Sequence, residues 1–122
     1  MQEHTFVDRS GHTTIFRHED GRLWLTELFG LTCGFSGTWA GPQRVRGLAV
    51  VDTSLGLFEG DGLEASAVRA ADDRLSVTWT MAGGRLQLES DWQHDAATGV
   101  WRRADTLINT GPEPVTVYQC QA

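Results

Sequence analysis

The chain has 122 residues, which is enough for one domain with its own core and too few for a barrel enzyme. Hydrophobic residues make up 40% of the chain and charged residues 21%, a balance typical of globular rather than disordered proteins. The formal net charge of −6 argues against a nucleic-acid partner, because phosphates bind to basic surfaces.

The polar first residues are followed by no apolar segment of the kind found in signal peptides. No run approaches the length needed to span a membrane, so we expect a cytoplasmic protein without a membrane partner. Cys33 and Cys120 are the two cysteines, and their wide separation gives neither a zinc motif nor a redox pair. A disulfide between them requires that the fold bring them together.

The first part of the chain predicts strands joined by tight turns. Residues 5–8 are a short expected strand, and Asp8-Arg9-Ser10-Gly11 is a turn. Residues 13–18 and 22–28 are rich in β-forming side chains and flank Asp20-Gly21. An Asp-Gly pair between two such runs favours a β-hairpin.

Residues 30–47 change character, because five glycines and Pro42 interrupt any periodicity. We expect a loop-rich crossing there, with a short strand over residues 31–35. Residues 48–52 are an apolar run that suits a buried strand, and residues 56–62 contain another Asp-Gly turn.

Residues 63–74 fit two structures. Their alanines favour a helix, whereas apolar and polar residues also alternate along the segment. We favour a strand, because strands are expected on both sides. Residues 75–81 alternate cleanly, and Gly83-Gly84 turns the chain back into residues 85–92.

The end of the chain shows the clearest period of two. Leu86, Leu88 and Ser90 alternate with polar neighbours, and Ala97-Thr98-Gly99 forms a turn. The alternation resumes over residues 100–108 and again over 115–120. Three such segments in succession predict an antiparallel meander with one buried face.

The side chains that could carry chemistry are few. Glycosidases need paired carboxylates, and Asp91, Asp95 and Asp105 are the nearest group in sequence. Turn and sheet positions favour a structural role for them. The four histidines show no convergent metal-ligand spacing, His18 being next to a hairpin turn, so we expect no catalytic residues, metal or cofactor.

Five tryptophans are many for a chain of this length. Trp79, Trp92 and Trp101 lie in regular strands, where packing explains them. Trp39 lies among glycines and Pro42, so it is the candidate for an exposed ring that contacts carbohydrate.

The C-terminal stretch also carries a family resemblance. The residues involved are Trp92, Asp95, Thr98, Gly99, Val100, Arg103, Asp105, Leu107, Asn109, Gly111, Pro114, Val115 and Val117. Their order resembles the late strands of the N-terminal β-sandwich of melibiase-type α-galactosidases, a glycoside hydrolase family similar to family 36. The match covers about a quarter of the chain well.

The resemblance implies an all-β fold of two packed antiparallel sheets, part or all of a galactose-mutarotase-like supersandwich. In that family the sandwich precedes a catalytic (β/α)₈ barrel, and nothing in residues 1–122 corresponds to a barrel. We therefore expect one β-sandwich domain, the N-terminal part of a longer glycoside hydrolase. It would be inactive alone and would pack on the catalytic barrel of the same protein.

Two other functions stay open at this point. One is an autonomous carbohydrate-binding or lectin-like module, and the other is a small sugar epimerase. The epimerase hypothesis lacks a convincing histidine and glutamate set. We also expect a homo-oligomer, because a chain that stops after residues 115–120 would leave a sheet edge open to another copy.

Overall fold

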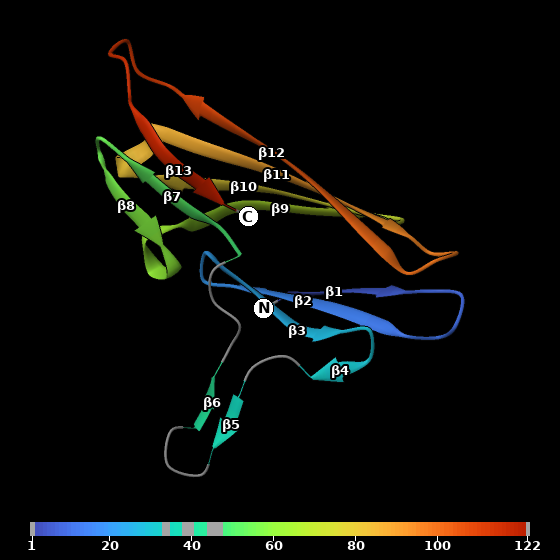
Figure 1. Ribbon diagram of the computed structural model, residues 1–122. Helices are drawn as coiled ribbons and strands as arrows, with labels where there is room; N and C mark the ends of the chain where they lie inside the picture. Colours follow the sequence, from blue (N-terminus) through green and yellow to red (C-terminus); the bar gives the residue numbers. More distant parts are fainter. Residues whose placement is uncertain (1, 33–34, 38–40, 44–47, 122) are drawn as a thin grey trace.

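The computed structural model describes residues 2–32, 35–37, 41–43 and 48–121 (Figure 1). Strands dominate these residues, and every pair of neighbouring strands is antiparallel. The predicted all-β, sandwich-like fold is confirmed. Within the described residues, no helix is both long and apolar enough to cross a membrane.

The largest sheet has four long strands in the order β12-β11-β10-β9. Its strands are β9 (Glu64–Ala71), β10 (Arg74–Met81), β11 (Leu86–Asp95) and β12 (Val100–Asn109). Each strand pairs with the next one in the chain, so this sheet is an antiparallel meander. The short 3₁₀ turn η2 (Ala82–Gly84) joins β10 to β11.

Three smaller sheets complete the described strands. The first has the order β1-β2-β3-β4, with β1 (Gln2–Val7), β2 (Thr13–Glu19), β3 (Arg22–Leu28) and β4 (Leu31–Thr32). The second has the order β13-β7-β8, with β7 (Val50–Thr53), β8 (Gly56–Glu59) and β13 (Val117–Gln121). The third pairs β5 (Phe35–Gly37) with β6 (Gly41–Gln43), and the 3₁₀ turn η1 (Gly60–Gly62) precedes β9.

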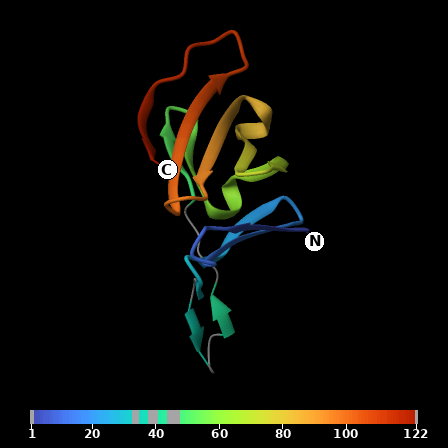
Figure 2. The same cartoon turned by 90° about the vertical axis from the view of Figure 1, so that its right-hand side faces the viewer.

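Two of the smaller sheets share the buried face of the large one. In Figure 1, β1, β2 and β3 lie below the right-hand part of the β9–β12 sheet, and β7, β8 and β13 lie beside its left-hand part. Figure 2 shows the same layering from the side. Phe16 on β2 contacts the ring of Trp92 at a centroid distance of 5.6 Å, which ties the first sheet to β11.

The alternation predicted for the C-terminal half sets the core. Leu86, Leu88 and Ser90 are buried, whereas Gln87, Glu89 and Asp91 between them are not. The strands β10 and β11 alternate in the same way, so one face of the sheet is apolar and the other polar. The core cluster comprises Phe6, Phe16, Leu23, Ala49, Val51, Leu63, Ala65, Leu75, Val77, Trp79, Met81, Leu86, Leu88 and Trp92.

Two local predictions are confirmed. The Asp20-Gly21 turn joins β2 to β3, and both residues have positive φ angles of 51° and 73°, as a tight hairpin turn requires. The ambiguous residues 63–74 contain the strand β9, so the alternation outweighed the helix propensity of the alanines. This strand can bury Ala65 against the core, which isolated propensity does not express.

One prediction is only partly covered and one needs correction. Of the strand expected over residues 31–35, the described residues belong to β4 and to the start of β5, which lie in different sheets, and residues 33–34 lie outside the described part. The third strand of the predicted meander, β13, pairs with β7 and not with β12, with Cys120 opposite Val51. Alternation fixes which face of a strand is buried and leaves its partner undetermined.

Hydrogen bonds join the first sheet to the large sheet at both ends. At one end, the amide of Ala65 donates to the carbonyl of Gly21 at 2.7 Å, and His18 Nε2 donates to the carbonyl of Ala65 at 3.1 Å. At the other end, the amide of Arg9 donates to the carbonyl of Ala96 at 2.7 Å. The first sheet is therefore fixed at its two ends.

Candidate functional site

A pocket of about 670 Å³ opens between the first sheet and the β11–β12 hairpin. We call it the hairpin pocket. Its volume lies in the range of small-molecule sites, which are concave, largely apolar and carry a few polar groups. The residues that line it come from four parts of the chain: the β1–β2 hairpin, the end of β3, Leu48 and the β11–β12 hairpin.

The inner wall of the hairpin pocket is apolar and aromatic. It consists of Phe16, Leu25, Leu28, Leu48, Trp92 and Trp101. Trp101 is partly exposed and stacks on the buried His94 ring at a centroid distance of 4.6 Å. Edge contacts with Phe6 and Phe16 also hold the indole, so its orientation is set by packing before any ligand arrives.

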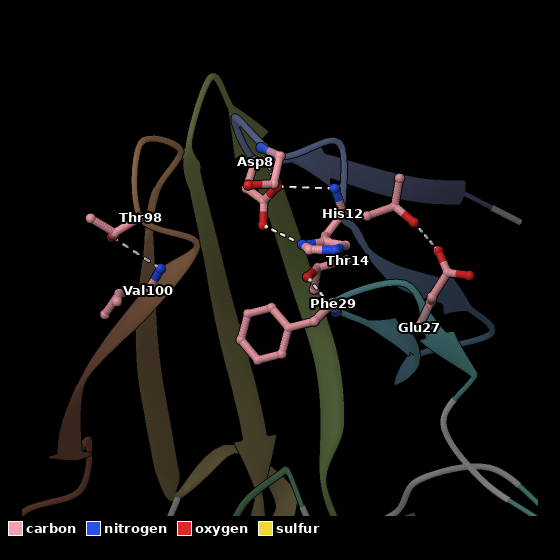
Figure 3. Close-up of polar contacts among 9 residues, drawn as sticks. Asp8, His12, Thr14, Glu27, Phe29, Thr98 and Val100 are labelled. Atoms are coloured by element: carbon pink, nitrogen blue, oxygen red, sulfur yellow. Dashed lines mark hydrogen bonds and ion pairs between the residues drawn. The ribbon is translucent and has the colours of Figure 1, made fainter.

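Asp8 and His12 supply the charged and titratable groups of the pocket wall (Figure 3). The Asp8 carboxylate accepts hydrogen bonds from the amides of Ser10, at 2.9 Å, and His12, at 3.0 Å. His12 Nδ1 lies 3.4 Å from the second carboxylate oxygen. The His12 amide is the main cause that holds the pKa of Asp8 below its ordinary value, so the carboxylate stays ionised and accepts hydrogen bonds.

The β1–β2 and β11–β12 turns meet at one end of the pocket. A Cβ atom on Gly99 would lie 2.8 Å from Asp8 Oδ2, a distance that real Cβ contacts do not show. Gly99 also has a φ of +77°, which glycine adopts without strain. The predicted turn glycine therefore also allows a close approach of Asp8 to the second hairpin.

Phe29 and Val100 stand on opposite lips of the pocket. Phe29 follows β3 and its side chain is 45% exposed, whereas Val100 begins β12 and is 51% exposed. In Figure 3 the Phe29 ring points across the opening towards Thr98 and Val100. The buried Thr14 hydroxyl accepts a hydrogen bond from the Phe29 amide at 3.4 Å.

The three aspartates considered from the sequence lie outside the pocket wall. Asp91 is on the outer face of the large sheet, where Arg74 donates to both of its oxygens at 2.8 and 2.5 Å. This partner lowers the pKa of Asp91. Asp95 accepts a hydrogen bond from the Ala97 amide at 3.0 Å, as expected of a turn aspartate.

Asp105 belongs to a polar network formed with residues of β11 and β12. Its carboxylate accepts hydrogen bonds from the Ser90 hydroxyl and from Arg103 Nε. The guanidinium also donates to the Leu48 carbonyl and lies 4.3 Å from the centre of the Trp92 ring. Burial is the main cause that lowers the pKa of Arg103, and Asp105 opposes it. These contacts give Asp105 a structural role.

No metal centre emerges from the described part of the chain, in which no group of three or more His, Cys, Asp or Glu residues could hold an ion. His18, next to the hairpin turn, donates from Nε2 to the carbonyl of Ala65. Cys120 is an exposed residue on β13, and partial burial of its thiol, followed by the nearby Asp105, raises the pKa of the thiol.

The sequence candidate for carbohydrate contact, Trp39, lies outside the described residues, as does Cys33. The sequence does not predict the hairpin pocket, and it indicates a packing role alone for Trp101. Asp8 and Gly99 each occupy a turn that the sequence predicts, whereas the turn at Phe29 has no such signal. Their convergence had no sequence signal, because it joins residues about ninety positions apart.

No family model matches this chain, and neither do any curated protein or any solved structure in the comparisons.

Proposed function

We propose that this chain is a non-catalytic carbohydrate-binding β-sandwich, and that the hairpin pocket is its saccharide site. The observation that carries this function is a wall of aromatic rings bordered by a carboxylate, an imidazole and hydroxyl groups. A saccharide presents C–H groups on its faces and hydroxyl groups around its edges. Aromatic faces suit the first, and hydrogen-bonding side chains suit the second.

The roles of the pocket residues follow from their positions. The partly exposed Trp101 offers an indole surface that neighbouring rings already hold in place. The ionised Asp8 accepts hydrogen bonds from sugar hydroxyls, and His12 beside it supplies a ring nitrogen. Preorganised groups lower the entropy lost on binding, which favours affinity in a small site.

The same arrangement argues against glycoside hydrolysis. Both retaining and inverting enzymes place two carboxylates on either side of the scissile bond. Of the described residues that line the pocket, Asp8 alone carries a carboxylate. We expect no release of nitrophenol from nitrophenyl glycosides by this chain. Turnover that a single aspartate substitution abolishes would contradict this.

Calorimetric titration with a panel of neutral mono- and oligosaccharides tests the binding function. His12→Ala, at a side chain that is 59% exposed, should weaken binding about fivefold to tenfold because one hydrogen bond is lost. Glu89→Ala is the matched control, since Glu89 is exposed on the outer face of β11. Equal affinities for both variants and the parent, or no binding by any saccharide, would rule out this site.

A second candidate function is the accessory role in an α-galactosidase-like hydrolase, packed on a catalytic barrel. The supporting observation is the edge strand β13, on which the neighbouring Val117 and Tyr118 side chains are both exposed. Exposed apolar side chains at a sheet edge suit a protein partner. The coding sequence downstream of Ala122 tests the proposal: a barrel in the same reading frame supports it, and a stop codon counts against it.

A further inference from the structure

Phe29 adopts a backbone conformation that is costly for its residue type. Its φ is +52°, in the left-handed region. Glycine, asparagine and aspartate are the residues that commonly adopt this region, and a bulky aromatic residue there is an outlier. The side chain is 45% exposed, so burial of the ring offsets only part of the free-energy cost of this backbone conformation. Residues held in strained backbone conformations cluster at functional sites.

The surrounding hydrogen bonds explain how the conformation persists. The Phe29 amide donates to Thr14 Oγ1 at 3.4 Å, and the Gly30 amide donates to the Thr13 carbonyl at 2.7 Å. These bonds tie the β3–β4 turn to β2. The turn fixes the backbone without requiring an aromatic residue, so the ring itself has no structural necessity.

The position of the ring indicates what it contacts. It points over the opening of the hairpin pocket towards Val100, which is 51% exposed on the opposite lip (Figure 3). Two exposed apolar side chains thus face each other across the mouth, outside the polar group formed by Asp8 and His12. A ligand with a polar and an apolar part would match both regions at once.

The charges of the wall restrict the ligand further. Of the described residues that line the pocket, none is an arginine, and the chain contains no lysine. An acidic ligand would meet the Asp8 carboxylate with no arginine or lysine on the wall to offset the repulsion. Phosphorylated sugars and uronic acids are therefore disfavoured.

Resting on the proposed saccharide-binding function, we infer that the hairpin pocket binds a neutral glycoside with an apolar aglycone. The aglycone, an aryl or alkyl group, lies between Phe29 and Val100, and the sugar hydroxyls contact Asp8 and His12. Phe29 is then the residue that determines the preference for the aglycone.

Titration calorimetry with paired ligands tests this inference. Phenyl hexosides of the gluco, galacto and manno series should bind at least about tenfold more tightly than the matched methyl hexosides, because a phenyl group buries more apolar area. Phenyl glucuronide should bind at least about tenfold more weakly than phenyl glucoside. Equal affinities for phenyl and methyl hexosides would overturn the inference and leave saccharide binding intact.

Two variants separate the contact from the fold. Phe29→Ala should abolish the preference for phenyl over methyl, whereas Leu57→Ala, at an exposed apolar site on β8, should leave that preference unchanged. Phe29→Gly should abolish the same preference and also raise the melting temperature, because it relieves the left-handed strain. A preserved phenyl preference in Phe29→Gly would overturn the role of the ring.

Phenol and benzyl alcohol complete the experiment. If they bind as tightly as the phenyl hexosides, the pocket recognises apolar groups alone, and the saccharide function is wrong together with the inference. If none of these ligands binds, both are also wrong. If the phenyl hexosides bind best and the phenyl preference disappears in Phe29→Ala, both proposals are supported.

Discussion

Single residues decide how the two hairpins that form the pocket meet, and Gly99 gives the sharpest case. Gly99→Ala should lower the free energy of unfolding by about 1–3 kcal/mol, because the new Cβ would lie 2.8 Å from Asp8 Oδ2 at a φ of +77°. Urea denaturation measures the loss.

A second glycine separates the clash from the strain. Gly83 also has a positive φ, of +62°, and a Cβ there would meet nothing within 4 Å. Gly83→Ala should therefore show the cost of the strained backbone alone, about 1 kcal/mol. Equal losses at the two sites would mean that the contact between Asp8 and the β11–β12 turn contributes nothing.

Asp105 and Asp91 both pair with arginine in environments that differ in exposure. Asp105→Ala should cost about 3 kcal/mol, because it leaves the half-buried Arg103 guanidinium without its carboxylate partner. Asp91→Ala should cost at most about 1 kcal/mol, since the Arg74 side chain is 56% exposed. Thermal unfolding of both variants at the same pH measures the two losses of stability. Equal losses would refute the structural role of Asp105.

His4 gives the fold a dependence on pH. Burial, followed by the nearby His18, lowers the pKa of His4 from the ordinary 6.5. Because the folded state disfavours the protonated ring, the contribution of His4 to stability is present above pH 6.5 and is lost as the pH falls towards the lowered pKa. Melting temperatures between pH 7.5 and pH 5 should fall less steeply in His4→Gln than in the parent, and identical slopes would contradict the assignment.

At the scale of the elements, the sequence predicts strands better than their partners. The alternation of Leu86, Leu88 and Ser90 with polar residues predicts a strand and its buried face, and Asp20-Gly21 predicts a hairpin turn. The pairing of β13 with β7 was not predictable in this way. A strand with one apolar face can lie beside any edge that presents its own apolar side.

The pocket lies beyond sequence prediction for a related reason. Asp8 and Gly99 belong to two turns that are each recognisable locally, and their contact depends on how two sheets are layered. An aromatic residue in a strand can also have two roles, in core packing and in lining a pocket. Trp101 packs against His94 and lines the pocket, so assigning it to packing alone described half of its role.

At the scale of the whole molecule, the β13-β7-β8 sheet has an open edge at β13. Among the described strands, β13 has β7 on one side and no neighbour on the other, and its Val117 and Tyr118 side chains are 46% and 67% exposed. Such an edge presents unpaired backbone donors and acceptors to another copy, and the chain has no lysine to discourage the pairing. We therefore predict a symmetric dimer, which closes the edge with the smallest number of copies.

Light scattering over a dilution series tests the dimer, because a dimer held by one strand pair should dissociate as the concentration falls. Val117→Lys should shift the equilibrium to monomers, since a lysine on the edge must lose its water on pairing. Thr106→Lys adds the same charge to the exposed outer face of β12 and should leave the dimer unchanged. A monomer at every concentration would show that the β13 edge is closed without a partner, and loss of the dimer in both variants would assign it to net charge instead.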